Sequence, residues 1–322
     1  MMNIKDSIAH NLDTVDGYIK KLTSHTIPAI AEISQHLITS GGKRVRPYLV
    51  ILSSRIFNVP AEKFTKIAAA IEIYHSATLL HDDVVDNAKH RRGTPSANDI
   101  WGNKSSILVG DYLLATSSSL IANMGNRELL GLFIRVLGLM AEGELVQLRL
   151  SRDTGISQQD YYTIIKKKTA YLISAACESG PIMGKASEKQ QSWMRQYGLL
   201  IGLAFQLIDD TIDYVSSGKL SGKDKGVDLK EGKVTLPMIV ALSNADKKEK
   251  ALLKAALANY SEDKDLFKRV YNIIEKNHGF EYTKKKAENF ANRALRLLDG
   301  LPQSLELDEL RKFTRTVAKR KS

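Results

Sequence analysis

Three aspartates at the end of an apolar run are the first residues in this chain whose types and spacing could do chemistry. Residues 79–86 read LLHDDVVD. On a helix, Asp82 and Asp86 lie one turn apart and point the same way, with Asp83 beside them. Carboxylate oxygens are the hard ligands that Mg²⁺ prefers, so this face predicts a magnesium site. A solvated acidic helix end is the simpler explanation of one such motif taken alone.

A second stretch repeats the pattern further along the chain. Residues 205–213 read FQLIDDTID, which again ends an apolar helical run and again places two aspartates one turn apart. Two carboxylate faces on separate helices of a bundle can oppose each other across a cavity, which is how bundles build divalent-metal sites. If neither motif binds metal, the same aspartate pattern must have arisen twice by chance. We therefore predict six metal ligands: Asp82, Asp83, Asp86, Asp209, Asp210 and Asp213.

Two segments rich in glycine and basic residues predict binding of an anion. Residues 40–47 read SGGKRVRP, in which the glycines let backbone N–H groups approach a ligand while Lys43 and Arg46 add fixed charge. An ordinary loop with a basic helix start is the alternative for this segment alone. Residues 221–237 combine glycines and lysines beside the second acidic motif, which is typical of a lid that closes over a bound phosphate.

The elements that must position these residues are predicted to be almost all helical. Apolar residues recur at spacings of three and four, and period-two alternation is scarce. Residues 107–122 and 129–140 are apolar on most faces, which predicts helices at the centre of a bundle. No linker divides the chain and no repeat of fixed period occurs, so we expect one all-α domain over residues 1–322.

Composition narrows the class of ligand. Hydrophobic residues make up 43% and charged residues 26% of the chain, as in a globular protein with a large core. The net charge of +11 first suggests nucleic acid, but the basic residues cluster beside glycines and acidic motifs with little aromatic interleaving. This distribution favours small phosphorylated ligands and no nucleic acid. The basic C-terminal tail is expected to be a solvated end, with a substrate lid or an acidic-lipid contact as alternatives.

Cysteine usage and hydropathy predict the cellular environment. The single cysteine, Cys177, lies in an apolar run and cannot form an internal disulfide, which indicates a buried thiol and a reducing cytoplasm. No run approaches the roughly 18 to 20 apolar residues that span a bilayer. A weak peripheral membrane contact is left open.

In order and spacing, these motifs resemble the trans-isoprenyl diphosphate synthases, and most closely the long-chain polyprenyl synthases of the octaprenyl type. The resemblance implies the isoprenoid-synthase fold, a single all-helical bundle around a deep central cavity, usually a homodimer. One departure is Gly180-Pro181, where a smoother helix is expected. The matching segments are residues 41–47, His75, residues 82–86 with 91–93, Lys168-Thr169, residues 205–213 and residues 223–237.

The resemblance also implies a role for each polar residue. The six aspartates would hold about three Mg²⁺ ions that bridge to the diphosphate of an allylic substrate. Metal and cations make diphosphate a better leaving group, and the double bond of isopentenyl diphosphate attacks the resulting allylic cation. The released diphosphate is the expected base. The implied catalytic residues are Asp82, Asp83, Asp86, Arg91, Lys168, Asp209 and Lys223. The allylic diphosphate would contact Arg91, Lys168, Thr169, Gln206, Lys223 and Lys233, and isopentenyl diphosphate would contact Lys43, Arg46, His75 and Arg92.

Product length should be set along the helix that precedes Asp82. Residues four to eight before it lie roughly 6 to 12 Å down the helix, where a growing hydrocarbon tail would pass. Ala77 and Thr78 are small there, which favours a product of about C30 to C50 from a farnesyl or geranylgeranyl primer. If Tyr74, one turn deeper, points into the cavity, the product stops near about C20, as in a geranylgeranyl diphosphate synthase. We favour a sideways Tyr74 and a floor formed by Phe133 and Met124.

Three other functions are weighed against prenyl elongation. The His81-Asp82 pair also occurs in helical metal-dependent phosphohydrolases, but the other histidines show no suitable grouping. A terpene cyclase or a head-to-head condensing enzyme with the same fold is the second alternative, and the 41–47 segment and Arg92, which would serve a second diphosphate substrate, speak against cyclisation. A non-catalytic partner subunit would not need two complete aspartate motifs.

Overall fold

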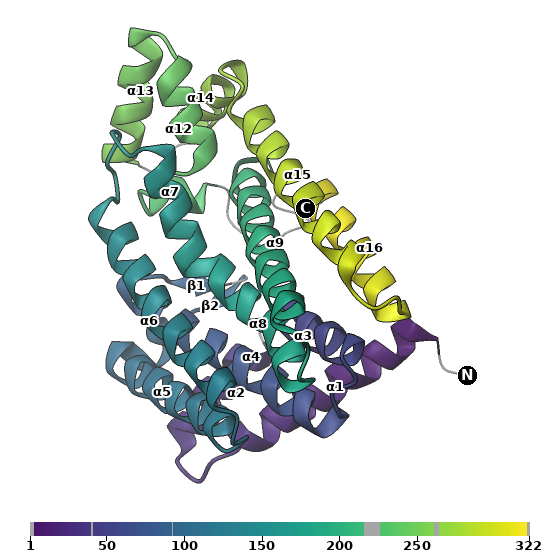
Figure 1. Cartoon of the computed structure of the whole chain (residues 1–322). Helices are drawn as coiled ribbons and strands as arrows, with labels where there is room; N and C mark the ends of the chain where they lie inside the picture. The colour runs from purple at the N-terminus through teal and green to yellow at the C-terminus, as the bar shows by residue number, and fades with distance from the viewer. Residues whose placement is uncertain (1–2, 40, 92, 216–225, 261–263, 321–322) are drawn as a thin grey trace. The chain divides into compact units, whose positions relative to one another are not determined.

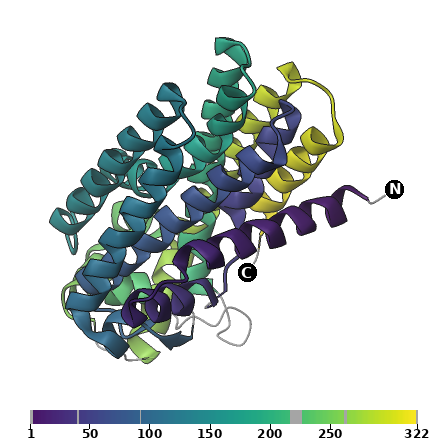
Figure 2. The ribbon, with the colours of Figure 1, turned by 90° about the horizontal axis from the view of Figure 1, so that it is seen from below.

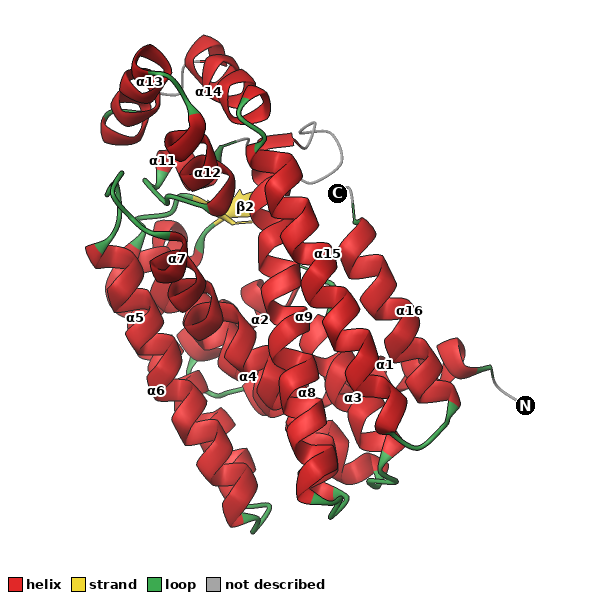
Figure 3. Cartoon of the chain, turned by 45° about the horizontal axis from the view of Figure 1, so that its top comes forward, coloured by secondary structure: helices red, strands yellow, loops and turns green. Residues whose placement is uncertain are grey.

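Helices form almost all of the described chain, as the apolar spacing predicts (Figure 3). The computed structural model describes residues 3–39, 41–91, 93–215, 226–260 and 264–320. The strands found there are β1 (His90–Arg91) and β2 (Thr94–Pro95), which pair in an antiparallel ribbon. The prediction of an all-α fold is therefore confirmed.

Contacts within the chain group it into two compact units, which are described separately. Unit 1 comprises residues 1–136, 172–196 and 298–311, and unit 2 comprises residues 137–171, 197–297 and 312–322. Helices α6 (Arg127–Arg149), α9 (Glu188–Val215) and α16 (Leu305–Lys319), which are labelled in Figure 1, have residues in both units. The prediction of one domain over residues 1–322 stays a prediction.

Unit 1 is built around a long buried helix, α4 (Ala61–Val85), which ends in the first aspartate motif. This helix packs against α1 (Ile4–Thr23), α3 (Val45–Ile56) and α5 (Ala97–Ala122), and Figure 2 shows α1, in purple, on the outer side of the unit. Pro28 and Pro60 stand at helix starts, where a missing N–H costs least. The other helices of unit 1 are α2 (Pro28–Thr39), α8 (Tyr171–Met183) and η2 (Leu298–Gly300).

Unit 2 has its own hydrophobic core, in which α12 (Leu236–Asn244) packs against α14 (Lys264–Lys276) and α15 (Gly279–Leu297). Two of its helices begin with a capping box: Ser157 and Asp160 start α7, and Asp246 and Glu249 start α13. The remaining elements of unit 2 are α7 (Gln158–Ile165), η1 (Lys166–Ala170), α11 (Val227–Lys230), α13 (Lys247–Ala258), α14 (Lys264–Lys276) and α15 (Gly279–Leu297).

The expectation that residues 107–122 and 129–140 form central helices is wrong for the single chain. Helix α5 packs on α4 and α2 with one side and leaves Ile107 and Leu108 on the surface, where Leu108 is 67% exposed. Ile134 of α6 is exposed as well. An all-round apolar pattern thus marks a helix with one face on the core and a second apolar face left on the surface of the unit.

Helix α5 also corrects the expectation about membrane spans. By length and composition alone, the 26-residue helix Ala97–Ala122 qualifies as one that could cross a bilayer, as the core helix of a globular protein can also do. Its polar groups are used inside unit 1, where the buried hydroxyl of Ser117 donates to the carbonyl oxygen of Ala70 at 2.8 Å. The apolar composition of α5 therefore also suits a helix that packs within a globular unit.

Candidate active site

The first aspartate motif lies at the C-terminal end of α4. The N–H of Asp86 donates to the carbonyl oxygen of Asp82 at 2.8 Å, so the helical turn continues through the motif. Asp82 and Asp86 are both half-buried, whereas Asp83 is only 2% exposed. The predicted one-turn spacing of Asp82 and Asp86 is confirmed, and Asp83 turns into the interior of unit 1.

Arg91 explains why Asp83 can be buried as an anion. The guanidinium Nε lies 2.8 and 2.7 Å from the two carboxylate oxygens of Asp83, and Nη2 lies 2.5 Å from Oδ1. The β1–β2 ribbon holds Arg91 in place, since the hydroxyl of Thr94 donates to its carbonyl oxygen at 2.9 Å. This positive charge offsets the cost of carboxylates at a helix C-terminus. The metal role of Asp83 and the diphosphate role of Arg91 stay predictions, and Arg92 lies outside the described residues.

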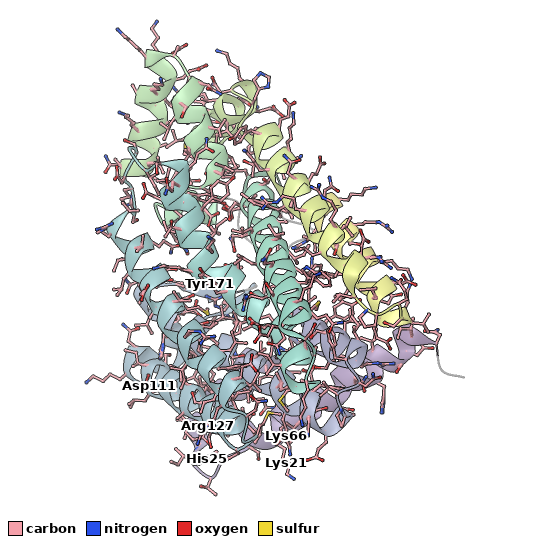
Figure 4. All side chains as sticks on the ribbon, in the orientation of Figure 1. Lys21, His25, Lys66, Asp111, Arg127 and Tyr171 are labelled. Carbon is pink, nitrogen blue, oxygen red and sulfur yellow. The ribbon has the colours of Figure 1, made fainter. Side chains whose placement is uncertain are left out.

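His81 links two helices of unit 1. Its Nε2 lies 3.2 Å from the carbonyl oxygen of Ile107 and 3.3 Å from a carboxylate oxygen of Asp111, which is labelled in Figure 4. Gly110 makes room for the ring, because a Cβ there would lie 2.6 Å from the His81 Cδ2. His81 thus ties α4 to α5, a role that spacing alone did not indicate.

The predicted length-setting residues lie on α4 and α6. Ala77 and Tyr74 are buried in unit 1, and burial raises the pKa of Tyr74, with the charge of Asp82 acting in the same direction. Thr78 is half-buried and donates to the carbonyl oxygen of His75 at 2.8 Å. Phe133 is buried on α6. Their roles, and that of His75 as a diphosphate ligand, stay predictions.

The basic segment before α3 contains one residue with a structural role. Arg44 adopts a left-handed conformation with φ 45° at the start of α3. Its guanidinium pairs with Asp16 at 2.9 Å and with the buried Glu72 at 2.8 Å. Lys43 is exposed and Arg46 is half-buried, and both remain predicted ligands of isopentenyl diphosphate.

The second aspartate motif, in unit 2, contains a chain of hydrogen bonds around a buried carboxylate. Asp210 is 4% exposed, and the hydroxyl of Tyr161 donates to its Oδ2 at 2.5 Å. The amide nitrogen of Gln206 donates to Asp210 Oδ1 at 2.7 Å, and the hydroxyl of Thr169 donates to Gln206 Oε1 at 2.8 Å. Burial raises the pKa of Asp210 to about 8, and the nearby charge of Asp228 acts in the same direction.

Thr169 and Lys168 belong to a short π-helix, η1, that directly precedes α8. Such wide turns are rare and often occur at functional sites, because they change the direction of one or two side chains. The Nζ of Lys168 lies 2.5 Å from a carboxylate oxygen of Glu144 on α6. The role of Lys168 as a ligand of the allylic diphosphate stays a prediction, and the sequence did not indicate the π-helix or the acidic partner of Lys168.

The outer aspartates of the second motif have partners in the tail and in α11. The guanidinium of Arg320 lies 2.7 Å from a carboxylate oxygen of Asp209, and its carbon lies 5.4 Å from the ring centre of Phe205. Asp213 Oδ2 accepts from the N–H of Asp228 at 3.3 Å. The C-terminal tail, expected to be a solvated end, therefore touches the second motif.

A cavity of about 130 Å³ lies beside this motif within unit 2. Its wall includes Lys168, Thr169, Gln206, Asp210 and Lys233. Lys233 also forms an ion pair with Glu231. The structure thus brings together four residues that we predicted for allylic diphosphate, together with Asp210. Lys223 and the other residues of 221–225 in the predicted lid lie outside the described residues, whereas residues 226–237 are described and include α11.

The carboxylates suit a hard divalent ion that is completed by a phosphorylated ligand. Among the described residues, no three His, Cys, Asp or Glu side chains form a ready metal-binding group. Mg²⁺ is commonly held by one or two carboxylates together with substrate phosphates and water. Asp82 with Asp86, and Asp209 with Asp213, each supply such a pair of oxygen donors. The residues therefore fit Mg²⁺ bound together with a diphosphate.

Comparison with known proteins identifies the family. The sequence profile described as polyprenyl synthetase matches residues 27–274. The chain belongs to the polyprenyl synthetase family. It is 32% identical to an octaprenyl diphosphate synthase of Escherichia coli, over 94% of this chain and 93% of that protein. It is 33% identical to a geranylgeranyl diphosphate synthase of Saccharolobus solfataricus, over 91% of this chain and 90% of that protein.

Solved structures of relatives agree with this assignment. A polyprenyl synthase from Caulobacter crescentus, crystallised with calcium and isoprenyl diphosphate, matches with a TM-score of 0.93 and 34% identity, covering 98% of this chain and 96% of that one. The chain is therefore a trans-prenyl diphosphate synthase of a family that binds divalent metals. The relatives range from geranylgeranyl to octaprenyl synthases, so the family does not fix the product length.

Proposed function

We propose that this enzyme makes a long-chain prenyl diphosphate, of about C30 to C50, by Mg²⁺-dependent head-to-tail addition of isopentenyl diphosphate to a farnesyl or geranylgeranyl primer. The observation that carries the proposed length is the absence of a large side chain at Ala77 and Thr78, one turn before Asp82. The likeness to the E. coli octaprenyl synthase supports the same range. The likeness to a geranylgeranyl synthase supports the alternative of a shorter product.

In this proposal the chain holds the allylic diphosphate through charge and hydrogen bonds. Asp82, Asp86 and Asp209 would hold Mg²⁺, which supplies positive charge to the diphosphate as it leaves. Lys168 and Lys233 would neutralise the remaining charge, and both line the cavity of unit 2. Glu144 keeps the ammonium of Lys168 oriented by its ion pair.

The second substrate would bind through the segment before α3. Lys43 and Arg46 would hold the diphosphate of isopentenyl diphosphate, with His75 and Arg92 as further ligands. Its double bond then attacks the allylic cation, and the released diphosphate takes the proton. No side chain of this chain is needed as the base.

The decisive experiment combines purified protein, Mg²⁺, farnesyl diphosphate and labelled isopentenyl diphosphate. After phosphatase treatment, the prenyl alcohols are separated by size. We expect alcohols of about C30 to C50. Recovery of no alcohol longer than farnesol would refute elongation, and a product that stops at geranylgeraniol would favour the shorter alternative.

Substitution on α4 tests the length assignment directly. Thr78→Phe places a large ring one turn before Asp82 and should shorten the main product, because the ring blocks the path of the tail. Tyr74→Ala should leave the length unchanged if Tyr74 packs sideways. A thermal melt of each variant controls for folding, and an unchanged product from Thr78→Phe would contradict the role given to this turn.

We also propose that the enzyme acts as a homodimer in the cytoplasm. The exposed apolar side chains of Ile107, Leu108 and Ile134 lie on two helices of unit 1 and would be covered by a second copy. The one cysteine is buried, which suits a reducing compartment. A weak contact with a membrane surface remains a further part of this proposal.

A further inference from the structure

The middle aspartate of each motif is turned into the protein and held by its own partners. In unit 1, Asp83 is 2% exposed and is bound on both oxygens by Arg91. In unit 2, Asp210 is 4% exposed and is bound on one oxygen by Tyr161 and on the other by Gln206. The two motifs therefore share a design in which the second aspartate is an internal anchor.

We propose that Tyr161 is a positioning residue for prenyl transfer, which holds Asp210 and, through Gln206, orients Thr169. This inference rests on the proposed function, because it concerns the same diphosphate site. Tyr161 is not part of either aspartate motif, nor of the basic segments. It stands 49 residues before Asp210 in the chain.

The surroundings of Tyr161 fix its hydroxyl in one direction. Its ring is buried on α7, which starts at the capping box of Ser157 and Asp160, so the helix begins at a defined residue. The ring packs edge-on against Tyr162, with their centres 5.6 Å apart. A buried, hydrogen-bonded phenol of this kind holds its partner more firmly than an exposed side chain can.

The hydrogen bonds run in one direction from Thr169 and meet those of Tyr161 at Asp210. Thr169 donates to Gln206, Gln206 donates to Asp210, and Tyr161 donates to the other oxygen of Asp210. If the phenol hydroxyl is removed, one oxygen of a buried carboxylate loses its donor. The carboxylate is then able to turn, and the amide of Gln206 and the hydroxyl of Thr169 lose their fixed orientation.

Holding Asp210 inward also fixes which way the neighbouring aspartates point. With 3.6 residues per turn, side chains one residue apart on a helix point about 100° apart. Around α9, Asp209 therefore lies about 100° and Asp213 about 60° from Asp210, both in the same direction and only about 40° from each other, so anchoring Asp210 fixes the directions of both. The anchor thus determines the orientation of the carboxylates that are proposed to meet Mg²⁺ and diphosphate.

Tyr161→Phe removes the hydroxyl and keeps the ring, and Tyr162→Phe is its matched control. The hydroxyl of Tyr162 is buried and has no hydrogen-bond partner among the described residues. Each variant removes one hydroxyl oxygen, and the two substituted positions are adjacent on the same helix. Any effect of Tyr161→Phe beyond that of Tyr162→Phe therefore belongs to the bond with Asp210.

The first measurement separates kcat from KM. Leaving a buried polar group without its hydrogen-bond donor commonly changes an equilibrium or a barrier by about tenfold. We expect Tyr161→Phe to lower kcat about tenfold while KM for isopentenyl diphosphate stays within about twofold, because that substrate is assigned to other residues. Tyr162→Phe should match the unmodified enzyme in both constants. A purely structural defect would instead lower the active fraction and the melting temperature.

The second measurement tests the hydrogen-bond chain itself. Thr169→Val breaks the chain at its other end, so the double variant with Tyr161→Phe should lose little more in kcat than the worse single variant. Multiplied losses in the double variant would overturn the chain. A Tyr161→Phe enzyme whose kcat equals that of Tyr162→Phe would overturn the role of Tyr161.

Binding of inorganic pyrophosphate in the presence of Mg²⁺, followed by calorimetry, gives a readout that needs no turnover. We expect Tyr161→Phe to weaken this binding about fivefold or more and Tyr162→Phe to leave it unchanged. If the unmodified protein binds pyrophosphate but makes no prenyl product, the proposed function fails while the role of Tyr161 is still decided by this comparison. Equal binding by the two variants would overturn the role.

Discussion

The ion pair between Arg320 and Asp209 should set how much Mg²⁺ the enzyme requires. The guanidinium lies 2.7 Å from the carboxylate, with the two side chains 21% and 27% exposed. A partly screened pair of this kind is worth about 0.5 to 1 kcal/mol. If Asp209 binds Mg²⁺ as proposed, the guanidinium of Arg320 competes with the ion for the negative charge of that carboxylate. Since 1.4 kcal/mol is a factor of ten, Arg320→Ala should lower the half-saturating Mg²⁺ concentration about two- to fivefold.

The assay follows initial rates with farnesyl diphosphate and labelled isopentenyl diphosphate, both saturating, against free Mg²⁺. Lys319→Ala is the matched control, because Lys319 is exposed and its substitution removes the same positive charge from the tail. Added salt should shrink the difference between Arg320→Ala and the unmodified enzyme, since salt screens the pair. An unchanged or higher Mg²⁺ requirement in Arg320→Ala, or an equal change in Lys319→Ala, would refute this explanation.

Three further predictions concern packing, assembly and the thiol. Gly180→Ala should lower the free energy of unfolding by about 1 to 3 kcal/mol, and with it the melting temperature, because the added Cβ would lie 2.5 Å from the backbone nitrogen of Ser54. Gly17→Ala is the control and should not lower the melting temperature, because a Cβ at Gly17 would have no atom within 4 Å. Leu108→Glu should convert a dimer to a monomer in light scattering, and an unchanged mass would contradict the proposed interface. Cys177 is buried and burial raises its pKa, so iodoacetamide should label it only after unfolding, and rapid labelling of the native enzyme would disprove its burial.

The helices, and the spacing of the aspartates within each motif, could be predicted from the local sequence. Apolar residues at intervals of three and four gave the helices, and Asp82 with Asp86 were placed one turn apart because a helix has fixed geometry. Gly180, noted as a departure, is explained by the close approach of α8 to the backbone of α3. That approach is a tertiary contact, so the sequence showed only that a small residue stood there.

Exposure was predicted less well than helicity. An apolar pattern records how much surface a helix would bury, but it does not say whether the partner is in the same chain. Helix α5 therefore looked central, although Leu108 lies on the surface of unit 1. The tail was misjudged for a related reason, because Arg320 reaches Asp209 across 111 residues of sequence.

The two middle aspartates show where spacing stops being informative. Asp83 and Asp210 occupy the same position in identical patterns, so a periodicity rule must treat them like the aspartates beside them. What distinguishes them is a donor supplied from elsewhere. For Asp83 that donor is Arg91, only eight residues later, and a nearby arginine could have been taken as its partner. For Asp210 the donor is Tyr161, in a helix that carries no motif. A buried carboxylate is stable only when hydrogen-bond donors reach its oxygens. If the second aspartate of such a motif is buried, a donor must therefore lie beside it, but only the fold shows which residue supplies that donor.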